Sequence, residues 1–185
     1  MKKLFFLLLL VQYALIQSVF SQPTKAEGGG VGNGQLAPSF SGKDQDGNTV
    51  SLDQYKGKKV VLYFYPKDDT PGCTAEACNL RDNIDSLTKA GFTIIGVSAD
   101  DQQSHQNFKA KYKLPFTLIA DVDKTISNQY GVWVEKEKDG QKYMGMARTT
   151  FIIDEKGIIV GKIDKVDTKD HARQLMTYET YKSLQ

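Results

Sequence analysis

Cysteine and histidine, the residues that most often bind metals or act as nucleophiles and bases, are scarce in this sequence. The 185 residues include two cysteines, Cys73 and Cys78, and two histidines, His105 and His171. The histidines stand far apart and at no spacing typical of a zinc site, so a zinc site is disfavoured. We expect both histidines to lie on the surface or to cap helices.

An excess of charge of either sign is also missing. The chain has 24 lysines and arginines against 22 aspartates and glutamates, and without Lys2 and Lys3 the two counts are equal. Proteins that bind nucleic acid or an anionic membrane present a basic surface. The composition therefore predicts no nucleic-acid partner and no stable membrane association of the mature protein.

The one long apolar run lies at the N-terminus, where two lysines precede a segment that ends at Ser21. This pattern predicts a secretory signal peptide over residues 1–21 and an exported protein, periplasmic or extracellular. A retained N-terminal membrane anchor is the alternative, because the run is close to the shortest spanning helix, about 17 residues. Residues 22–35 are rich in glycine and predict a flexible linker, which leaves residues 36–185 as one domain.

The order of the expected elements predicts the fold class. An Asp46-Gly47 turn joins two short strands, residues 59–66 and 92–100 are expected to be buried strands, and residues 74–91 a helix ending at Gly91. We then expect a helix capped by Ser104, a strand over 116–121, a short helix over 124–131, an exposed hairpin turning at 139–140, two strands within 148–163 and a helix over 169–184. This order predicts an α/β protein with a thioredoxin-like fold, a mixed central sheet flanked by helices, and an N-terminal β-hairpin.

Both cysteines lie within "TPGCTAEAC", residues 70–78, five positions apart. One interpretation is a structural disulfide, but closing so short a loop contributes only about 2 kcal/mol. If the segment is helical, the two Cα atoms lie roughly 8 to 9 Å apart, beyond the reach of about 7 Å for a disulfide. A permanent bridge and an intact helix are therefore incompatible, whereas a bridge that forms while the helix opens is compatible with the spacing.

The residues before Cys73 favour a redox role. Thr70 can cap a helix and Pro71 suits its first position, so that Cys73 falls in the first turn. There the free backbone amides and the positive end of the helix dipole stabilise a thiolate. Cys73 is therefore the candidate nucleophile, and Cys78 faces a different side of the helix.

The stretch "YPKDDTPGCTAEACNLRD" resembles the active-site segment of peroxiredoxins, in particular the PrxQ or bacterioferritin comigratory protein group of the AhpC/TSA superfamily. Pro66, Thr70 and Cys73 match that family's Pro-x-x-x-Thr-x-x-Cys pattern. The similarity begins near Leu36 and continues through "APSFSGKDQDGNTVSL", "GVSADDQQSHQNFKAKYKLPFTLIAD" and "RTTFIID" to the last helix.

The resemblance assigns roles to individual residues. It implies that Pro66, Thr70, Cys73 and Arg148 form the peroxide site, with Cys73 as the peroxidatic nucleophile, and that Cys78 is the resolving cysteine. Donors from a threonine hydroxyl, a backbone amide and a guanidinium would stabilise the charge that develops on the peroxide oxygens.

Glu76 resembles a family position that helps to orient the arginine, although an acidic residue in the first helical turn explains it equally well. The implied activity is that of a thiol peroxidase that reduces hydrogen peroxide and organic hydroperoxides to water and alcohols. Cys73 would become a sulfenic acid, Cys78 would convert it to an intrachain disulfide, and a thioredoxin-like dithiol protein would reduce it again. No metal, haem or flavin is required, and the intrachain pair removes any chemical need for a dimer, so a monomer is expected.

Three alternatives stay open at this point. An exported thioredoxin-like disulfide reductase would generally have a Cys-x-x-Cys motif and a cis-proline before its "TFIID"-like strand, and Met146 to Thr149 contain no proline. Copper chaperones that share the thioredoxin fold use a closer cysteine pair and a histidine. A non-catalytic secreted domain with a structural disulfide is the third.

Overall fold

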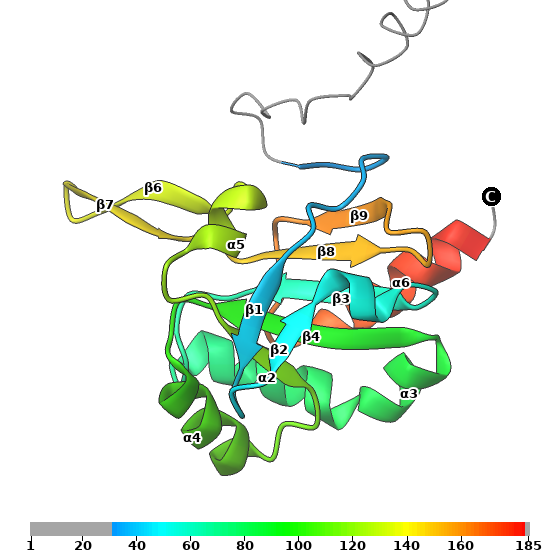
Figure 1. Ribbon diagram of the computed structural model, residues 1–185, viewed down its shortest axis with the longest axis horizontal. Coiled ribbons are helices and arrows are strands. Elements are labelled where there is room, and N and C mark those ends of the chain that lie inside the picture. Colours follow the sequence, from blue (N-terminus) through cyan, green and yellow to red (C-terminus); the bar gives the residue numbers. More distant parts are fainter. Residues whose placement is uncertain (1–30, 184–185) are drawn as a thin grey trace, which may run out of the picture.

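The computed structural model describes residues 31–183, and its centre is a seven-stranded mixed sheet in the order β2-β1-β5-β4-β3-β8-β9 (Figure 1). The strands of this sheet are β1 (Ser41–Asp44), β2 (Thr49–Ser51), β3 (Lys59–Phe64), β4 (Phe92–Ser98), β5 (Thr117–Ala120), β8 (Thr149–Ile153) and β9 (Ile159–Ile163). A separate hairpin consists of β6 (Trp133–Lys138) and β7 (Gln141–Met146). The helices are α2 (Pro71–Asp82), α3 (Ile84–Lys89), α4 (Gln102–Tyr112), α5 (Thr125–Gln129) and α6 (His171–Ser183), with a 3-10 turn, η1, at Leu52–Tyr55.

The strand β3 is central, as its unbroken run of apolar residues predicts. It pairs in parallel with β4 and antiparallel with β8, and every side chain from Val60 to Phe64 is buried. A strand covered on both faces has no polar face to present, so its sequence shows no alternation. The mixed sheet around β3, with helices packed against it, is the predicted fold class.

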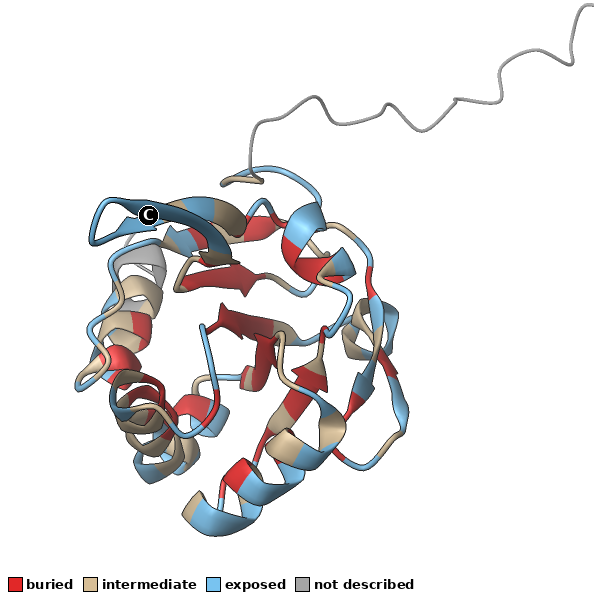
Figure 2. Ribbon diagram, turned by 90° about the vertical axis from the view of Figure 1, so that its left-hand side faces the viewer, coloured by how far each residue is buried: buried red, intermediate tan, exposed pale blue. Residues whose placement is uncertain are grey.

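Two apolar clusters fill the space on the two faces of the sheet. One contains Leu62, Phe64 and Phe151 together with Ile126 of α5. The other lies under α2, α3, α4 and α6, which contribute, in that order, Leu80, Leu87, Phe108 and Leu175. Figure 2 shows the buried residues gathered on the strands and on the inner sides of the helices. Cys73 belongs to the second cluster, so the candidate nucleophile lies on the face of the sheet that these four helices cover.

The predicted tight turns form where the sequence places glycine after aspartate. Gly47 has a φ of +82° between β1 and β2, and Asp139 and Gly140 have φ values of +54° and +76° between β6 and β7. Positive φ costs glycine little, and two consecutive positive values match the twist of a two-residue hairpin. The β6–β7 hairpin projects from the body of the molecule (Figure 1) and exposes Tyr143 and Met144.

Two predicted details of the helices are wrong. The predicted single helix over residues 74–91 is broken at Asn83, with φ −110° and ψ 12°, where the side-chain Nδ2 donates to the Asn79 carbonyl at 2.9 Å. An asparagine that bonds to a local carbonyl competes with the helical backbone. The cap of α4 is Asp101, which accepts from the Ser104 amide at 2.8 Å, and not Ser104 itself.

The predicted signal peptide over residues 1–21 and most of the predicted linker lie outside the described residues. Within the described part, the Gly34 amide donates to the Ile159 carbonyl at 2.7 Å, and the Ile159 amide donates to the Gln35 carbonyl at 2.9 Å. The last two residues of the predicted linker are thus attached to β9. Among the helices of residues 31–183, none is long and apolar enough to cross a membrane.

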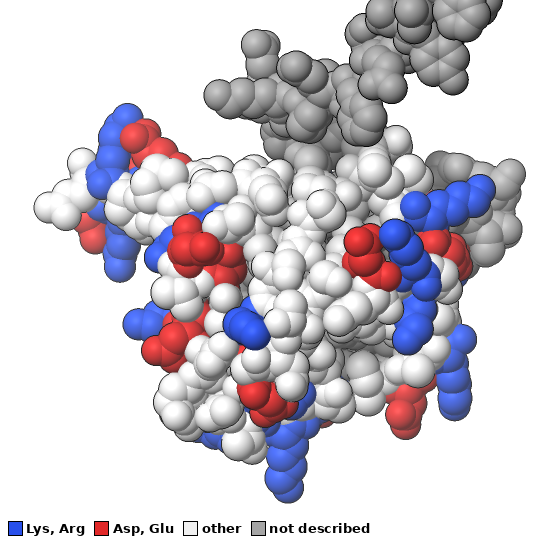
Figure 3. All heavy atoms as spheres, in the orientation of Figure 1, with Lys and Arg blue, Asp and Glu red and all other residues white. Residues whose placement is uncertain are grey.

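Charged side chains of both signs are mixed over the surface, as the balanced composition predicts. On the face drawn in Figure 3, lysines and arginines alternate with aspartates and glutamates. Several pairs are close enough for ion pairs, such as Lys142 with Glu135 at 2.8 Å on the hairpin. These exposed pairs contribute little stability individually.

Candidate active site

The first turn of α2 positions Cys73. Thr70 is the N-cap, with extended φ and ψ of −90° and 152°, and Pro71 occupies the first helical position, where the missing amide hydrogen costs nothing. Cys73 is therefore in the first turn and is only 2% exposed. The Thr70 hydroxyl donates to the Lys67 carbonyl at 3.0 Å, and it makes no side-chain cap to a helix amide. The predicted place of Thr70 is confirmed, but not the capping bond.

Arg148 and Glu76 meet at the sulfur of Cys73. The Arg148 Nη2 lies 3.3 Å from the Cys73 Sγ, while its Nη1 bonds to the Glu76 Oε2. Arg148 follows β7 and precedes β8, whereas Cys73 and Glu76 lie on α2 one turn apart. Partial burial lowers the pKa of Arg148, but the charges of Glu76 and Cys73 raise it more, and the net pKa is above its usual value. The guanidinium is thus held as a cation against the sulfur.

Two further predicted site residues, Pro66 and Cys78, have no hydrogen bond to the Cys73 sulfur in the part of the chain that the structure describes. Pro66 is in the loop between β3 and α2 and is exposed, so shielding of the sulfur by Pro66 stays a prediction. Cys78 is half-buried on α2, and both cysteines are free thiols. The Asp82 carboxylate raises the pKa of Arg81, and the Cys78 sulfur adds a smaller effect in the same direction. The contact with Arg148 belongs to Cys73.

The prediction that His105 lies on the surface or caps a helix is wrong, because its side chain is completely buried. Its Nδ1 is 2.7 Å from the Asp68 Oδ2 and its Nε2 is 3.1 Å from the Ile119 carbonyl. The Tyr65 hydroxyl donates to the other oxygen of Asp68 at 2.7 Å, and the Ser104 hydroxyl donates to Asp68 Oδ2 at 2.8 Å. These bonds fix Asp68, which lies in the loop that leads to Thr70 and Cys73.

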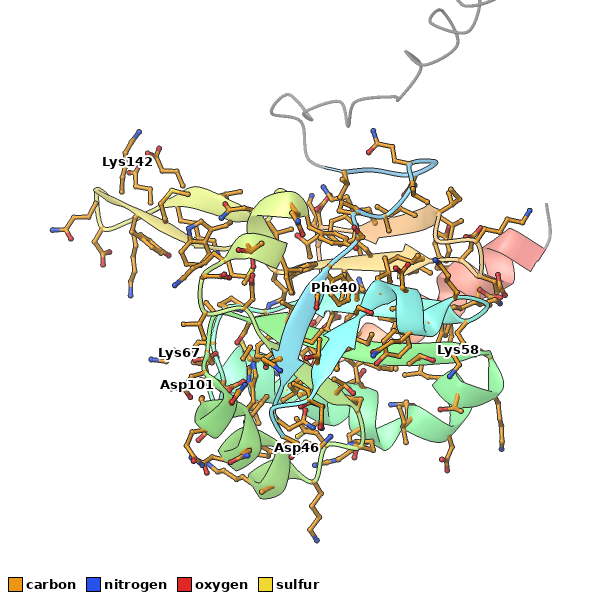
Figure 4. All side chains as sticks on the ribbon, viewed as in Figure 1. Phe40, Asp46, Lys58, Lys67, Asp101 and Lys142 are labelled. Atoms are coloured by element: carbon orange, nitrogen blue, oxygen red, sulfur yellow. The ribbon has the colours of Figure 1, made fainter. Side chains whose placement is uncertain are left out.

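The next residue of that loop, Asp69, is held by two side chains at the end of α4. Asp69 has a φ of +54°, and its carboxylate accepts from the Lys111 Nζ at 2.6 Å and from the Tyr112 hydroxyl at 2.5 Å. These two donors lower the pKa of Asp69. Figure 4 shows Lys67 and Asp101 at the end of the molecule where β3 and β4 stop, so α4 and this loop share one edge of the sheet.

Replacing Asp68 by asparagine should destabilise the protein by about 1.5 to 3 kcal/mol, the usual contribution of a hydrogen bond to a charged group. The amide cannot accept from Tyr65, Ser104 and His105 together as the carboxylate does. Urea unfolding of the reduced protein measures the loss. The matched control is Asp53→Asn, because Asp53 is exposed and Lys56 is its one ion-pair partner within residues 31–183. An Asp68 variant as stable as this control would contradict the anchoring role.

His171 is the second histidine that was wrongly placed. Its side chain is completely buried, with Nδ1 at 3.2 Å from the Glu76 Oε1 and Nε2 at 3.1 Å from the Thr150 Oγ1. The sequence carries a weak signal for both histidines: each precedes a buried apolar residue by three or four positions, His105 before Phe108 and His171 before Leu175. That spacing places each histidine on the inner face of its helix.

A buried thiol in the first turn of a helix, in contact with a guanidinium, is typical of a thiol-based redox enzyme. Residues 33–162 match the model of the AhpC/TSA family, and the chain belongs to that family. A putative peroxiredoxin Bcp of Coxiella burnetii is 52% identical over 143 residues, which cover 77% of this chain and 95% of the relative. Peroxiredoxin Bcp of Bacillus subtilis is 46% identical over 143 residues, or 77% and 91% of the two chains.

Solved structures agree with these sequence relatives. Peroxiredoxin Q of Xanthomonas campestris has a TM-score of 0.73 at 34% identity and covers 77% of this chain and 90% of its own. A cysteine-to-serine variant of Xylella fastidiosa PrxQ has a TM-score of 0.75 at 26% identity and covers 83% and 99%. The predicted resemblance, the thioredoxin-like fold and the enzyme class are confirmed: the chain is a thiol peroxidase, an oxidoreductase. The alternatives of a disulfide reductase, a copper chaperone and a non-catalytic domain are not supported.

The same relatives correct the predicted location. The aligned domain makes up 95% and 91% of the Coxiella burnetii and Bacillus subtilis relatives, so neither has room for a leader and linker of the predicted length before it. The prediction of an exported, periplasmic or extracellular protein is therefore wrong by this comparison. Hydropathy alone suggested a signal, because a short apolar segment after two lysines satisfies the pattern whatever the domain behind it.

Proposed function

We propose that this chain reduces hydrogen peroxide and organic hydroperoxides through Cys73, with Cys78 as the resolving cysteine and a thioredoxin-like dithiol protein as the reductant. The observation that carries the proposal is the contact of 3.3 Å between the Arg148 guanidinium and the Sγ of a buried cysteine in the first turn of α2. The guanidinium and the helix N-terminus both direct N–H donors and positive charge to the place where the sulfur reacts.

In the first step, the Cys73 thiolate attacks one peroxide oxygen and the O–O bond breaks. The sulfur becomes a sulfenic acid, and the second oxygen leaves as hydroxide or alkoxide and takes up a proton. The Arg148 guanidinium and the Cys73 amide are donors that can stabilise the departing charge, and the Thr70 hydroxyl can donate to the peroxide when it turns from the Lys67 carbonyl. Burial of the sulfur keeps water from competing for these donors.

In the second step, the Cys78 sulfur attacks the sulfenic sulfur, an S–S bond forms and water leaves. Both cysteines lie on the intact helix α2, where helical geometry separates their Cα atoms by roughly 8 to 9 Å. A disulfide needs a shorter separation, so the turns that carry the two cysteines must open. A dithiol protein then reduces the disulfide by thiol exchange and supplies the two electrons that the peroxide consumed.

The proposed substrate range includes organic hydroperoxides. The bacterioferritin comigratory protein of Xanthomonas campestris, which is 33% identical to this chain with a TM-score of 0.72, has been described for its alkyl peroxide reduction activity. We propose a monomer as the active unit, because the nucleophile and the resolving thiol lie on one helix of one chain.

Mass spectrometry of the reduced protein treated with one equivalent of hydrogen peroxide tests the proposal directly. The expected product has lost two hydrogens, and proteolysis should give a single cross-linked peptide that contains Cys73 and Cys78. Addition of a thioredoxin system should then give continuous consumption of peroxide. A protein that consumes peroxide without oxidation of Cys73 would refute the proposed nucleophile, and oxidation of Cys73 without the cross-link would refute the role of Cys78.

A further inference from the structure

A chain of polar contacts runs from the sulfur of Cys73 into the interior and ends at His171. Arg148 joins the sulfur to one oxygen of Glu76, and His171 faces the other oxygen. The side chains of both Glu76 and His171 are completely buried, while Arg148 is 21% exposed. The last two members therefore have no access to water, and each depends on the partner that the fold supplies.

The inner atoms of Glu76 and His171 have few hydrogen-bond partners within the described residues. Among residues 31–183, neither the Glu76 Oε1 nor the His171 Nδ1 has a hydrogen-bond partner, and the two atoms face each other at an ion-pair distance of 3.2 Å. On its other side, the His171 Nε2 is 3.1 Å from the Thr150 hydroxyl. The Nδ1–H is therefore the donor that the fold brings to this carboxylate oxygen, and a small turn of the imidazole would complete the hydrogen bond that both buried atoms need.

Among the ion pairs of residues 31–183, Glu76 is the one charged group paired with His171. From β3, the Tyr63 ring meets the imidazole edge to face at 6.4 Å. Burial raises the pKa of Tyr63 well above its usual value, and the charge of Glu76 adds to that effect, so the phenol is neutral. From α2, Asn79 accepts from the Ala172 amide at 2.8 Å and donates to the Lys169 carbonyl at 2.8 Å, which fixes the start of α6 and with it the position of His171.

The two oxygens of Glu76 face different partners, His171 on Oε1 and Arg148 on Oε2. A carboxylate with both oxygens free takes an arginine side chain with two parallel hydrogen bonds, from two guanidinium nitrogens. In this site only Oε2 of Glu76 binds Arg148, through Nη1, and Nη2 remains directed at the Cys73 sulfur. If Oε1 were free, the two-bond arrangement would draw Nη2 away from the sulfur.

We propose that His171 is a positioning residue of the thiol site: it holds the Glu76 Oε1, prevents a two-bond pair between Glu76 and Arg148, and so leaves one guanidinium nitrogen for Cys73. The inference rests on the proposed roles of Cys73 and Arg148. It extends the site to the first residue of α6, 95 positions beyond Glu76 in the sequence.

Two matched substitutions separate the two ring nitrogens. His171→Asn keeps an amide N–H near the position of Nδ1, whereas His171→Gln keeps one near the position of Nε2. In a Cys78→Ser background, only Cys73 can react with iodoacetamide. We expect His171→Gln and His171→Leu to slow this alkylation at neutral pH by about tenfold, the lower end of the loss seen when a residue that orients a site residue is removed. His171→Asn should stay within about twofold of the parent.

The pH dependence of alkylation distinguishes positioning from general loosening. His171→Gln and His171→Leu should reach the same maximal alkylation rate as the parent, but only at higher pH. The reason is that the sulfur has lost a hydrogen-bond donor, whereas the reactivity of the thiolate itself is unchanged. Asn and Gln variants that react equally, or a loss that persists at high pH, would overturn the proposal. Thermal unfolding of each variant identifies those that fold, and the Asn and Gln pair keeps the comparison valid if His171→Leu does not.

A double-mutant cycle with Glu76→Gln completes the test. If His171 acts through Glu76, His171→Gln should change the alkylation rate much less in the Glu76→Gln background than in the parent. Additive effects would show that His171 acts elsewhere. Alkylation uses no peroxide, so a Cys73 that follows this pattern but does not react with peroxide would refute the proposed function and leave the role of His171 intact.

Discussion

Arg148→Ala should lower the rate constant for reaction of Cys73 with hydrogen peroxide by about 10² to 10³, the usual effect of removing one donor to a developing oxyanion. The guanidinium nitrogen nearest the sulfur is 3.3 Å away, and the raised pKa of Arg148 keeps it a cation at any pH the folded protein meets. The substitution also leaves the buried Glu76 without its cation, so some loss of stability is expected in addition.

Stopped-flow measurement of a single turnover, started with fully reduced protein, isolates this step from recycling. Arg173→Ala is the matched control, since Arg173 is 69% exposed on α6 and pairs only with Asp170 among the contacts described. It should react at the rate of the unmodified chain. An Arg148 variant that folds and reacts equally fast would assign Arg148 a structural role only.

Cys78→Ser should abolish turnover supported by a thioredoxin system while leaving the first reaction with peroxide intact. The sulfenic acid on Cys73 would then have no thiol within the chain to condense with, because the only other cysteine is gone. Excess peroxide should convert it to the sulfinic acid, which the dithiol reductant does not reverse. Mass spectrometry follows both products, and sustained turnover by this variant would assign resolution to an outside thiol.

The same pair of thiols predicts a change in backbone protection. Disulfide formation should speed amide exchange across residues 70–82, because the helix must open to bring the sulfurs together. The effect should extend to residues 169–173, since Asn79 of α2 holds the Lys169 carbonyl and the Ala172 amide. The Cys78→Ser protein, which cannot form the bond, serves as the control. Equal protection of the reduced and disulfide forms would contradict the opening of α2.

Local features were predictable because neighbouring residues in the chain produce them. The turns at Asp46-Gly47 and Asp139-Gly140, the buried strand β3 and the place of Cys73 in the first turn of α2 all follow from backbone preferences and short-range patterns. The family motif around Cys73 indicated the peroxidase chemistry for the same reason, since its proline, threonine and cysteine fall within eight residues, on one loop and the start of one helix.

The sequence alone misplaced the features that depend on distant partners. The cap of α4 is Asp101 and not the predicted Ser104, because the Ser104 hydroxyl donates to Asp68, 36 positions earlier. Both histidines are buried, and no local rule could pair His171 with Glu76 or His105 with Asp68, since burial of a polar ring is favourable only when the fold brings it a partner. The apolar N-terminal run met every local criterion for an export signal, yet the comparison with relatives contradicted it.

The amino-acid sequence by itself determined the chemistry: one thiol at the start of a helix, a second thiol five positions later, and an arginine segment that the family motif singles out. Only the tertiary structure decided how that chemistry is held. It brought Arg148 to the sulfur from the segment before β8, and it placed a buried carboxylate and a buried imidazole behind it from α2 and α6. The physical reason is that charges and hydrogen bonds in a dry interior depend on atomic distance, and distances between segments far apart in the chain are set by the packing of the helices on the sheet.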